Sequence, residues 1–510
     1  MHWADVVARQ AWPSKGSLTV ATGTSPSGPF HIGHLREVVT GWAITRAIRE
    51  SGRDARLIFV IDSMDPLRKL PPGTPEAFRE YLGRPLYDVP SPDGDGSWAE
   101  HFARPFLEVV GELGVELEPV WDHELYLSGR YAPYVARALE RRERIAGIIS
   151  AKTGKPLPRD WFPVFARCSA CGRLTKNVLG WEGDRVRYRC ECGHEGEASI
   201  SRGEVKLLWR VEWPARWSLL GVDLEPFGKD HAAAGGSYDT GRDIAREVFG
   251  REPPYPVPYE WIELRGRGPL SSSAGLVVDP GDVVRASSPE ITNFLILRVH
   301  YSRHISFDPS TDIPKLHDDF DEAEERFHAG EEDDLTRAYE LSLTPSSPRV
   351  RVQRVPFRHL VLVVQLSGSF EDVVRRLLRS GHLREPLREE DLRELRRRVE
   401  AVRFWLERFA PEEARVRVLE EPPRLELGPG ELSFIECLLR EFGGIEWRAE
   451  EIQSAIFRCA RGTGLGPRRA FPVLYRILFG RDHGPRAGPL LEELGRDFIV
   501  LRLRTYAKGS

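Results

Sequence analysis

Two histidines in the run His31-Ile32-Gly33-His34 are the side chains with the clearest chemical potential in this chain. They follow a short β-type run and a Gly/Pro/Ser turn, and they precede an amphipathic helical pattern. A helix N-terminus offers unpaired N–H groups and the positive end of its dipole to a phosphate. Gly33 permits close approach of a nucleotide, and imidazoles can stabilise a departing pyrophosphate. We therefore expect His31, Gly33 and His34 to bind ATP and both histidines to be catalytic, with a polar helix cap as the alternative.

A second candidate is the hydroxyl run Ser271, Ser272 and Ser273, which follows the segment 265–268 of alternating Arg and Gly. Glycines on both sides predict a mobile loop, and consecutive hydroxyls can hold a triphosphate. Such a run alone is also typical of an ordinary surface loop. Its order after the histidine run favours a second half of one ATP site.

Four of the six cysteines lie between residues 168 and 192, as Cys168-x-x-Cys171 and Cys190-x-Cys192. Two short-spaced pairs about twenty residues apart fit a tetrahedral structural zinc site. The second pair is tighter than usual, so His194 is an alternative ligand to Cys192, and free buried thiols are the other interpretation. Cys437 and Cys459 lie in apolar helical patterns and are expected in the core.

The order of predicted elements indicates how these residues are positioned. A strand over 18–22, a helix over 35–48 and a buried strand over 57–61 form a βαβ unit. This predicts an α/β fold of the Rossmann type, with a doubly wound parallel sheet, a cysteine-bearing insertion and a C-terminal α-helical domain. The expected domains are the two halves of the catalytic domain at 1–75 and 205–310, the insertion at 76–204, a linker at 311–345 and the helical domain at 346–510.

Composition sets broad limits on the class of protein. The 510 residues carry 41% hydrophobic and 29% charged residues with a net charge of -4, which is typical of a multidomain globular chain. No apolar run is long enough to span a bilayer and no signal peptide is evident, so we expect a cytoplasmic protein without a membrane partner. An arginine-rich run at 393–398 and basic residues at 375, 376 and 379 can contact RNA, but interleaved acids favour solvated helix faces.

The chain resembles class I lysyl-tRNA synthetases, the archaeal-type enzymes, along its whole length. The runs that carry the resemblance are 23–28 with 31–37, 62–71, 227–239, 253–260, 356–360 and 484–489. The family implies activation of L-lysine with ATP and transfer to the 3′ end of tRNA(Lys), with an anticodon-binding helical domain. It also implies ATP contacts at Gly228, Asp230, His231 and Ser273. Mg²⁺ is a general expectation from ATP chemistry, and the oligomeric state stays open, with a monomer compatible with the sequence.

The resemblance implies a lysine site at Gly23, Ser25, Trp209, Asp230, His231 and Tyr259. Aromatic walls and an acid at the far end suit a pocket that binds a long cationic side chain. Asp62 and Asp65 follow a predicted strand and are the acids that we expect there, the alternative being a helix cap or a loop ion pair. Trp213 and Trp217 are expected in the core.

The serine loop departs from the family, which usually carries a lysine at each end of it. Pro269 and Ala274 stand there, and we hypothesise that Arg265 and Arg267 supply the charge, Arg267 as a catalytic residue. Losing one charge donor costs about 3 kcal/mol, so Arg267→Ala is predicted to slow pyrophosphate exchange at least about tenfold. Two alternatives stay open: a non-catalytic paralogue that binds tRNA, and an adenylating ligase with another acceptor.

Overall fold

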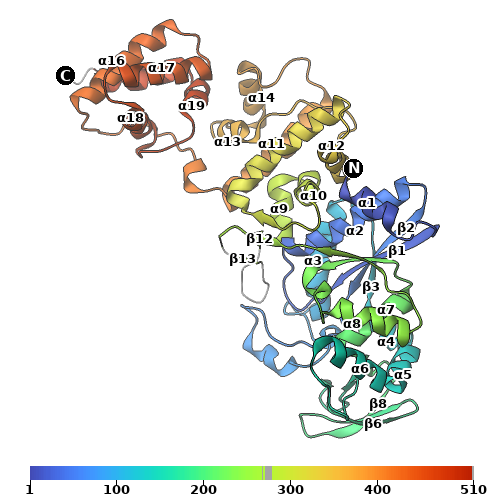
Figure 1. Ribbon diagram of the computed structural model, residues 1–510. Helices are drawn as coiled ribbons and strands as arrows, with labels where there is room; N and C mark the ends of the chain where they lie inside the picture. The colour runs from blue at the N-terminus through green and yellow to red at the C-terminus, as the bar shows by residue number, and fades with distance from the viewer. Residues whose placement is uncertain (267, 270–277, 508–510) are drawn as a thin grey trace. The chain divides into compact units, whose positions relative to one another are not determined.

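The main sheet has five parallel strands in the order β11-β10-β1-β2-β3 (Figure 1). The computed structural model describes residues 1–266, 268–269 and 278–507. The strands are β1 (Ser17–Thr24), β2 (Asp54–Ile61), β3 (Glu118–Trp121), β10 (Leu224–Gly228) and β11 (Tyr255–Tyr259). Helix α2 (Ile32–Glu50) connects β1 to β2, so the predicted βαβ unit and the α/β class are confirmed.

Helices cover both faces of this sheet, as expected for a doubly wound fold. On one face α2 lies so close that a Cβ at Gly41 would stand 2.9 Å from Cγ2 of Thr22. On that side α1 (Trp3–Gln10) and α10 (Pro289–Leu297) contact α2. On the other face Ile58 and Phe227 pack against Trp213 of α7 (Trp209–Leu220), which α8 (Ser237–Glu247) contacts.

The strands β1 and β10 separate towards their carboxyl ends. They pair only at Val20 and Leu224, whereas β1 pairs with β2 over its full length, from Ser17 to Thr24. The connections run in opposite directions on the two sides of β1, so this is the topological switch point of the sheet. Open α/β sheets bind ligands in the crevice at such a point.

The range 76–204, which we expect as an insertion, also contributes β3 to the main sheet. Its helices are α3 (Trp98–Glu112), α4 (Asp122–Leu127), α5 (Ala132–Glu140) and α6 (Arg142–Thr153). Two small antiparallel sheets follow. One contains β4 (Val164–Arg167), β5 (Leu174–Thr175) and β9 (Val205–Leu207), and the other contains β6 (Val178–Glu182), β7 (Arg185–Arg189) and β8 (Glu195–Ser199). The four-residue β3 gives too short a pattern to be predicted.

The chain forms two compact units. The first comprises residues 1–284, 289–307 and 329–346, and the second comprises 285–288, 308–328 and 347–510. The first unit also contains a small sheet of β12 (Ile262–Leu264), β13 (Gly268–Pro269) and β14 (Ile305–Phe307), and α12 (Asp334–Ser342); α9 (Pro280–Ser287) spans the first unit boundary. Among the described helices, none has the length and apolar character needed to cross a bilayer.

The second unit is helical, as predicted for the C-terminal region. Its helices are α11 (Pro309–His328), α13 (Phe357–Gln365), α14 (Phe370–Arg379), α15 (Glu389–Arg408), α16 (Pro429–Gly444), α17 (Ala449–Gly462), α18 (Pro467–Phe479), α19 (Ala487–Leu494) and α20 (Arg496–Ala507). Within the arginine-rich run, Arg398 departs from the expected solvated face. It is buried and donates to both carboxylate oxygens of Asp321 at 2.6 Å.

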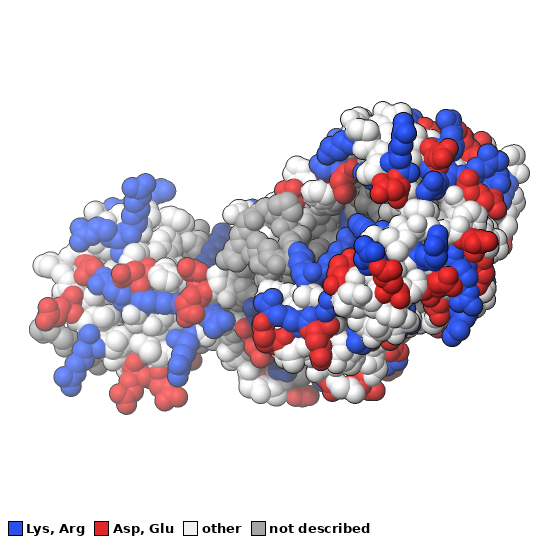
Figure 2. All heavy atoms as spheres, turned by 90° about the horizontal axis from the view of Figure 1, so that it is seen from below, with Lys and Arg blue, Asp and Glu red and all other residues white. Residues whose placement is uncertain are grey.

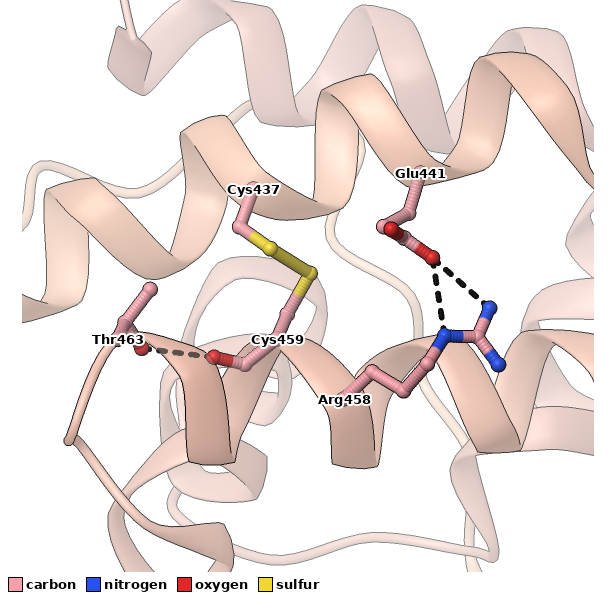
Figure 3. The surroundings of a disulfide bond; sticks show 5 residues. All are labelled: Cys437, Glu441, Arg458, Cys459 and Thr463. Carbon is pink, nitrogen blue, oxygen red and sulfur yellow. Dashed lines mark hydrogen bonds and ion pairs between the residues drawn. A yellow bond between two sulfur atoms is a disulfide. The ribbon is translucent and has the colours of Figure 1, made fainter.

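Cys459 is buried in the core of the second unit as expected, Cys437 packs against that core, and the two form a disulfide between α16 and α17 that the sequence did not indicate (Figure 3). Their Cα atoms are 5.6 Å apart, and the short connection 445–448 brings the two helices together. Arg458 donates to Glu441 at 2.8 Å beside the disulfide (Figure 3). A sequence separation of 22 does not indicate pairing unless the helix packing is known.

Candidate active site

A pocket of about 390 Å³ lies at the crevice between the carboxyl ends of β1 and β10. Eighteen residues line it: Gly23, Thr24, His31, Gly33, His34, Glu37, Trp209, Trp213, Arg216, Glu225, Pro226, Phe227, Gly228, Asp230, His231, Tyr259, Trp261 and Ile262. They come from the end of β1, the start of α2, α7, β10 with the short helix at Lys229–Ala232, the end of β11, and residues 261–262 at the start of β12. The structure therefore brings together most of the sequence-predicted site residues.

The two histidines form the cap of α2. The N–H of Gly33 donates to Nδ1 of His31 at 3.1 Å, and the N–H of His31 donates to Nδ1 of His34 at 3.1 Å. Because an amide N–H only donates, we assign the ring proton of His31 to Nε2. Nδ1 of His34 also lies 3.2 Å from the carbonyl oxygen of His31, to which a protonated Nδ1 would donate. Burial lowers the pKa of His31 to about 3 and that of His34 to about 4, so both rings are neutral near pH 7.

The cap overturns one expectation about this helix. The first three amides of α2 are not open to a phosphate, because Ile32 donates to the carbonyl of Val278, Gly33 to His31 Nδ1 and His34 to the carbonyl of His31. The histidines are thus a helix cap and line the pocket at the same time. What α2 offers a phosphate is the dipole field and the Nε2 side of the imidazoles.

Glu37 is the acid whose surroundings best suit a cationic ligand. One carboxylate oxygen accepts from the N–H of Gly23 at 2.6 Å, and the other accepts from the hydroxyl of Tyr259 at 2.6 Å. Burial raises the pKa of Glu37 to about 7, and these two hydrogen bonds oppose the rise. Of the residues that the structure describes, no Lys or Arg forms an ion pair with Glu37.

Tryptophans of α7 form an aromatic wall. The rings of Trp209 and Trp213 stack with centroids 5.2 Å apart, and Trp213 packs against Trp217. Trp213 and Trp217 are buried as expected, and their indole N–H groups donate to the two carboxylate oxygens of Glu225. Burial raises the pKa of Glu225 to about 8. A second acid is therefore fixed in the pocket wall by neutral donors.

The two acids expected from the sequence have other partners. Asp62 is buried and forms an ion pair with Arg216 of α7, while burial raises its pKa to about 6. Asp65 contacts Lys206 at 3.1 Å. Neither aspartate lines the pocket; Asp65 lines a smaller hollow of about 260 Å³ together with Ser25. Ser25 is thus separate from Gly23, which does line the main pocket.

Asp230 and His231 lie on the short helix that follows β10, at the rim of the pocket. The His231 ring lies 5.3 Å from that of Trp213, and burial lowers the pKa of this histidine. A Cβ at Gly228 would stand 2.7 Å from Oδ1 of Asp230, an exposed side chain that can turn away. The predicted residues Arg267, Ser271, Ser272 and Ser273, and also Ala274, lie outside the described residues.

The four cysteines of the insertion gather at one point. Their sulfur atoms all lie within 4.8 Å of one another, with 3.7 Å between Cys168 and Cys192 and 3.6 Å between Cys171 and Cys190. A tetrahedron of thiolates at about 2.3 Å from zinc has edges of about 3.8 Å, so this donor set fits that ion. His194 instead lies with Nε2 3.0 Å from the hydroxyl of Ser169.

Sequence reasoning missed Glu37 and Glu225 as pocket residues. Glu37 stands three residues after His34 in the same helix, so helical spacing places the two side chains on one face. Glu225 stands within an apolar strand, and an acid at such a position requires buried partners. Both signals were available, but an acid next to a strand end is the more usual indication of a binding site.

Comparison with known proteins agrees with this geometry. The family model of class I tRNA synthetases (K) matches residues 1–344. A lysine–tRNA ligase of Thermoplasma volcanium is 36% identical over 512 residues, covering 100% of both chains. One of Archaeoglobus fulgidus is 39% identical over 507 residues, covering 99% of each. The chain therefore belongs to the class I tRNA synthetase (K) family and is an enzyme of the ligase class that uses ATP.

Proposed function

We propose that this chain is a lysine–tRNA ligase. It activates L-lysine with ATP, the lysine carboxylate attacking the α-phosphorus and releasing pyrophosphate. The lysyl group then passes from the adenylate to a ribose hydroxyl at the 3′ end of tRNA(Lys), releasing AMP. The observation that carries the proposal is the half-buried carboxylate of Glu37, which faces a pocket with an aromatic wall and has only neutral hydrogen-bond donors.

A buried carboxylate without a cation is unfavourable, so this pocket favours a ligand that brings one. The ε-ammonium of lysine pairs with Glu37, and its methylene chain lies against Trp209. An acidic side chain is repelled, and a neutral one leaves the carboxylate uncompensated. The names of the full-length relatives support the choice of lysine among the cationic amino acids.

The histidine cap supports the ATP half of the proposal. The neutral imidazole of His31 offers an Nε2–H donor without placing a full charge in the pocket, and the His34 ring is also neutral. Such donors stabilise negative charge that develops on the leaving pyrophosphate. Gly33, Gly228, Asp230 and His231 complete the nucleotide side of the pocket. The serine loop with Arg267 belongs to the same proposal on sequence grounds.

Two metal ions belong to the proposal in different ways. Cys168, Cys171, Cys190 and Cys192 hold a structural Zn²⁺, which fixes the turns between β4, β5, β7 and β8. Mg²⁺ accompanies ATP as its usual counterion. None of the four cysteines lines the pocket, so we assign the zinc a structural role.

The decisive experiment uses the purified full chain with each of the twenty amino acids, ATP and labelled pyrophosphate. Pyrophosphate exchange with lysine alone is the expected result, followed by lysine charging of total tRNA. Exchange with a different amino acid would refute lysine as the substrate. Exchange without charging would support an adenylating ligase with another acceptor, and absence of both activities would support a tRNA-binding paralogue.

A further inference from the structure

The active-site pocket contains a cation of its own. Among the eighteen described residues that line it, Arg216 is the only Lys or Arg. It stands on α7 with its guanidinium 5.6 Å from the ring centroid of Trp209. Glu37 lines the same pocket and accepts hydrogen bonds from a backbone amide and a tyrosine hydroxyl. The protein therefore holds an internal competitor for the carboxylate that we assign to the substrate ammonium.

Asp62 binds this cation from outside the pocket lining. It directly follows β2, its N–H donates to the carbonyl of Thr24 at 3.0 Å, and it does not line the pocket. Its carboxylate accepts a hydrogen bond from Nη2 of Arg216. Burial raises the pKa of Asp62, and the Arg216 guanidinium opposes that rise. The ion pair thus stabilises both buried charges and fixes Arg216 to a residue that the substrate does not use.

Glu37 and Asp62 are held by neighbouring residues of β1. Glu37 accepts from the N–H of Gly23 at 2.6 Å, and Asp62 donates to the carbonyl of the next residue, Thr24. The two carboxylates are near enough for Asp62 to add to the rise in the pKa of Glu37, of which burial is the main cause. Nε of Arg216 is buried and has no hydrogen-bond partner among the described residues. A guanidinium released from Asp62 therefore has both a spare donor and a second carboxylate in the same region.

Other charged groups around the ion pair are already occupied. Both carboxylate oxygens of Glu225 accept indole N–H groups. Lys206 pairs with Glu212 and, at 3.1 Å, with Asp65, and it does not line the pocket. The remaining titratable groups of the pocket lining are neutral rings and one carboxylate at the rim: His31, His34, His231, Tyr259 and Asp230. Arg216 is therefore the charge that decides whether the pocket presents a free carboxylate.

Burial makes the choice of partner for Arg216 strong. On the face that Figure 2 displays, Lys and Arg side chains stand among Asp and Glu in contact with water, and exposed pairs of this kind contribute little. Arg216 is only 2% exposed. An unpaired guanidinium at such a place is unfavourable, so it takes another carboxylate when its own is removed.

We propose that Asp62 is a positioning residue for lysine recognition, because its ion pair with Arg216 leaves the carboxylate of Glu37 free for the ε-ammonium of the substrate. The inference rests on the proposed function, in which Glu37 binds that ammonium. Asp62 acts through Arg216 and does not touch lysine. If the ion pair served the fold alone, loss of either partner would have the same effect on lysine binding, and loss of both would restore nothing.

The test uses the full chain and four variants: Asp62→Asn, Arg216→Gln, the double variant Asp62→Asn/Arg216→Gln, and the control Asp223→Asn. Asp223 is also a buried acid of the first unit, pairs with Arg251 at 3.2 Å and does not line the pocket. Binding of labelled L-lysine is measured by equilibrium dialysis between pH 6 and pH 8. Thermal unfolding of each variant is followed in parallel.

At pH 8 we expect Asp62→Asn to bind lysine at least about tenfold more weakly than the parent, since Arg216 then occupies Glu37 in about nine molecules of ten or more. Arg216→Gln and the double variant lack the competing cation, so each should bind lysine at least about tenfold more tightly than Asp62→Asn. Asp223→Asn should bind lysine as the parent does, even if it unfolds more easily.

The pH profile gives a readout that a structural role would not move. The parent should bind lysine more weakly at pH 6 than at pH 8, because Glu37 takes up a proton in this range. In Asp62→Asn this dependence should disappear, since the paired guanidinium holds Glu37 ionised. It should return in the double variant, which has no cation beside Glu37.

The outcomes separate the possible failures. A lysine affinity of Asp62→Asn within about threefold of the parent would overturn the proposal, and so would a double variant that binds lysine no better than Asp62→Asn. If Asp62→Asn does not fold, a loss of about tenfold or more in Arg216→Gln would overturn it as well. A parent chain that binds no lysine would instead refute the proposed function, and this inference with it.

Discussion

Glu37→Gln is the substitution that most directly tests how the pocket selects its amino acid. It keeps the side-chain volume and removes the charge that we assign to the ε-ammonium of lysine. Breaking a buried ion pair by removing one partner costs about 3 to 5 kcal/mol, or a factor of about 150 to 5,000. We therefore expect the KM for lysine in pyrophosphate exchange to rise at least a hundredfold, while the KM for ATP changes little.

The pH dependence gives the same prediction an independent readout. The pKa of Glu37 is about 7, so only about a tenth of the carboxyl is ionised at pH 6 and about nine tenths at pH 8. The KM for lysine in the parent should therefore rise about tenfold from pH 8 to pH 6, and Glu37→Gln should abolish this dependence. Tyr259→Phe removes a hydrogen bond that lowers this pKa, so its profile should shift to higher pH.

The raised pKa of Glu37 also predicts how the folding stability of the ligand-free enzyme depends on pH. A carboxyl whose pKa rises from 4.5 to about 7 on folding reduces stability as the pH rises through that window. The deficit is about 3 kcal/mol above pH 7, and Gln removes it but loses a hydrogen bond worth about 1 to 2 kcal/mol. At pH 8 the variant should thus unfold no more easily than the parent.

A matched control is Glu118→Gln, which removes an exposed carboxylate that pairs with Arg56 at 3.1 Å. It should change neither the KM for lysine nor its pH dependence. If Glu37→Gln keeps a KM for lysine within threefold of the parent, Glu37 is not the ammonium partner. Glu225, the second acid of the pocket, would then be the next residue to test.

Four further predictions concern other parts of the chain. Gly23→Ala should destabilise the protein by about 1 to 3 kcal/mol, because its Cβ would stand 2.5 Å from the carbonyl oxygen of Val60. The control Gly16→Ala, whose Cβ has no atom within 4 Å, should leave the stability unchanged, and equal denaturation midpoints for the two variants would contradict this prediction. Metal analysis should find one zinc per chain and less in Cys168→Ser, and under half a zinc in the parent would dismiss the site. Cys437→Ser should lower the stability of the second unit by about 3 kcal/mol in denaturant, because the disulfide closes a loop between cysteines 22 residues apart, and it should not slow pyrophosphate exchange. A change under about 1 kcal/mol would count against a stabilising disulfide. Arg267→Ala should slow pyrophosphate exchange at least about tenfold, and an unchanged rate would sink the loop hypothesis.

Hydrophobic periodicity and residue spacing predicted the features of this fold that depend on short stretches of sequence. The βαβ unit, the helical C-terminal region and the grouping of four cysteines follow from periodicity and spacing over a few tens of residues. The state of Asp62 does not, because its partner Arg216 stands 154 residues away in the chain. Glu37, in contrast, faces the pocket without an ion-pair partner among the described residues, a property that only the folded chain reveals.

The cap of α2 shows a second limit. The sequence identified His31 and His34 correctly as polar groups at a helix start, and the same two residues both cap the helix and line the pocket. Pattern reasoning treated cap and ligand site as alternatives because it counts residues. Each imidazole has two nitrogens, and here one nitrogen completes the helix while the other is left for a ligand.

The path of the chain through its two units limits how this enzyme can be divided. Helix α11 belongs to the second unit, yet segments of the first unit, 289–307 and 329–346, flank it in sequence. Its buried residues Ile313, Leu316 and Phe320 pack inside the second unit. A chain truncated after residue 346 would therefore expose the apolar face of α11 to solvent and would tend to aggregate. Neither one proteolytic cut nor one stop codon can release either unit whole. The two units are therefore made and degraded as one polypeptide.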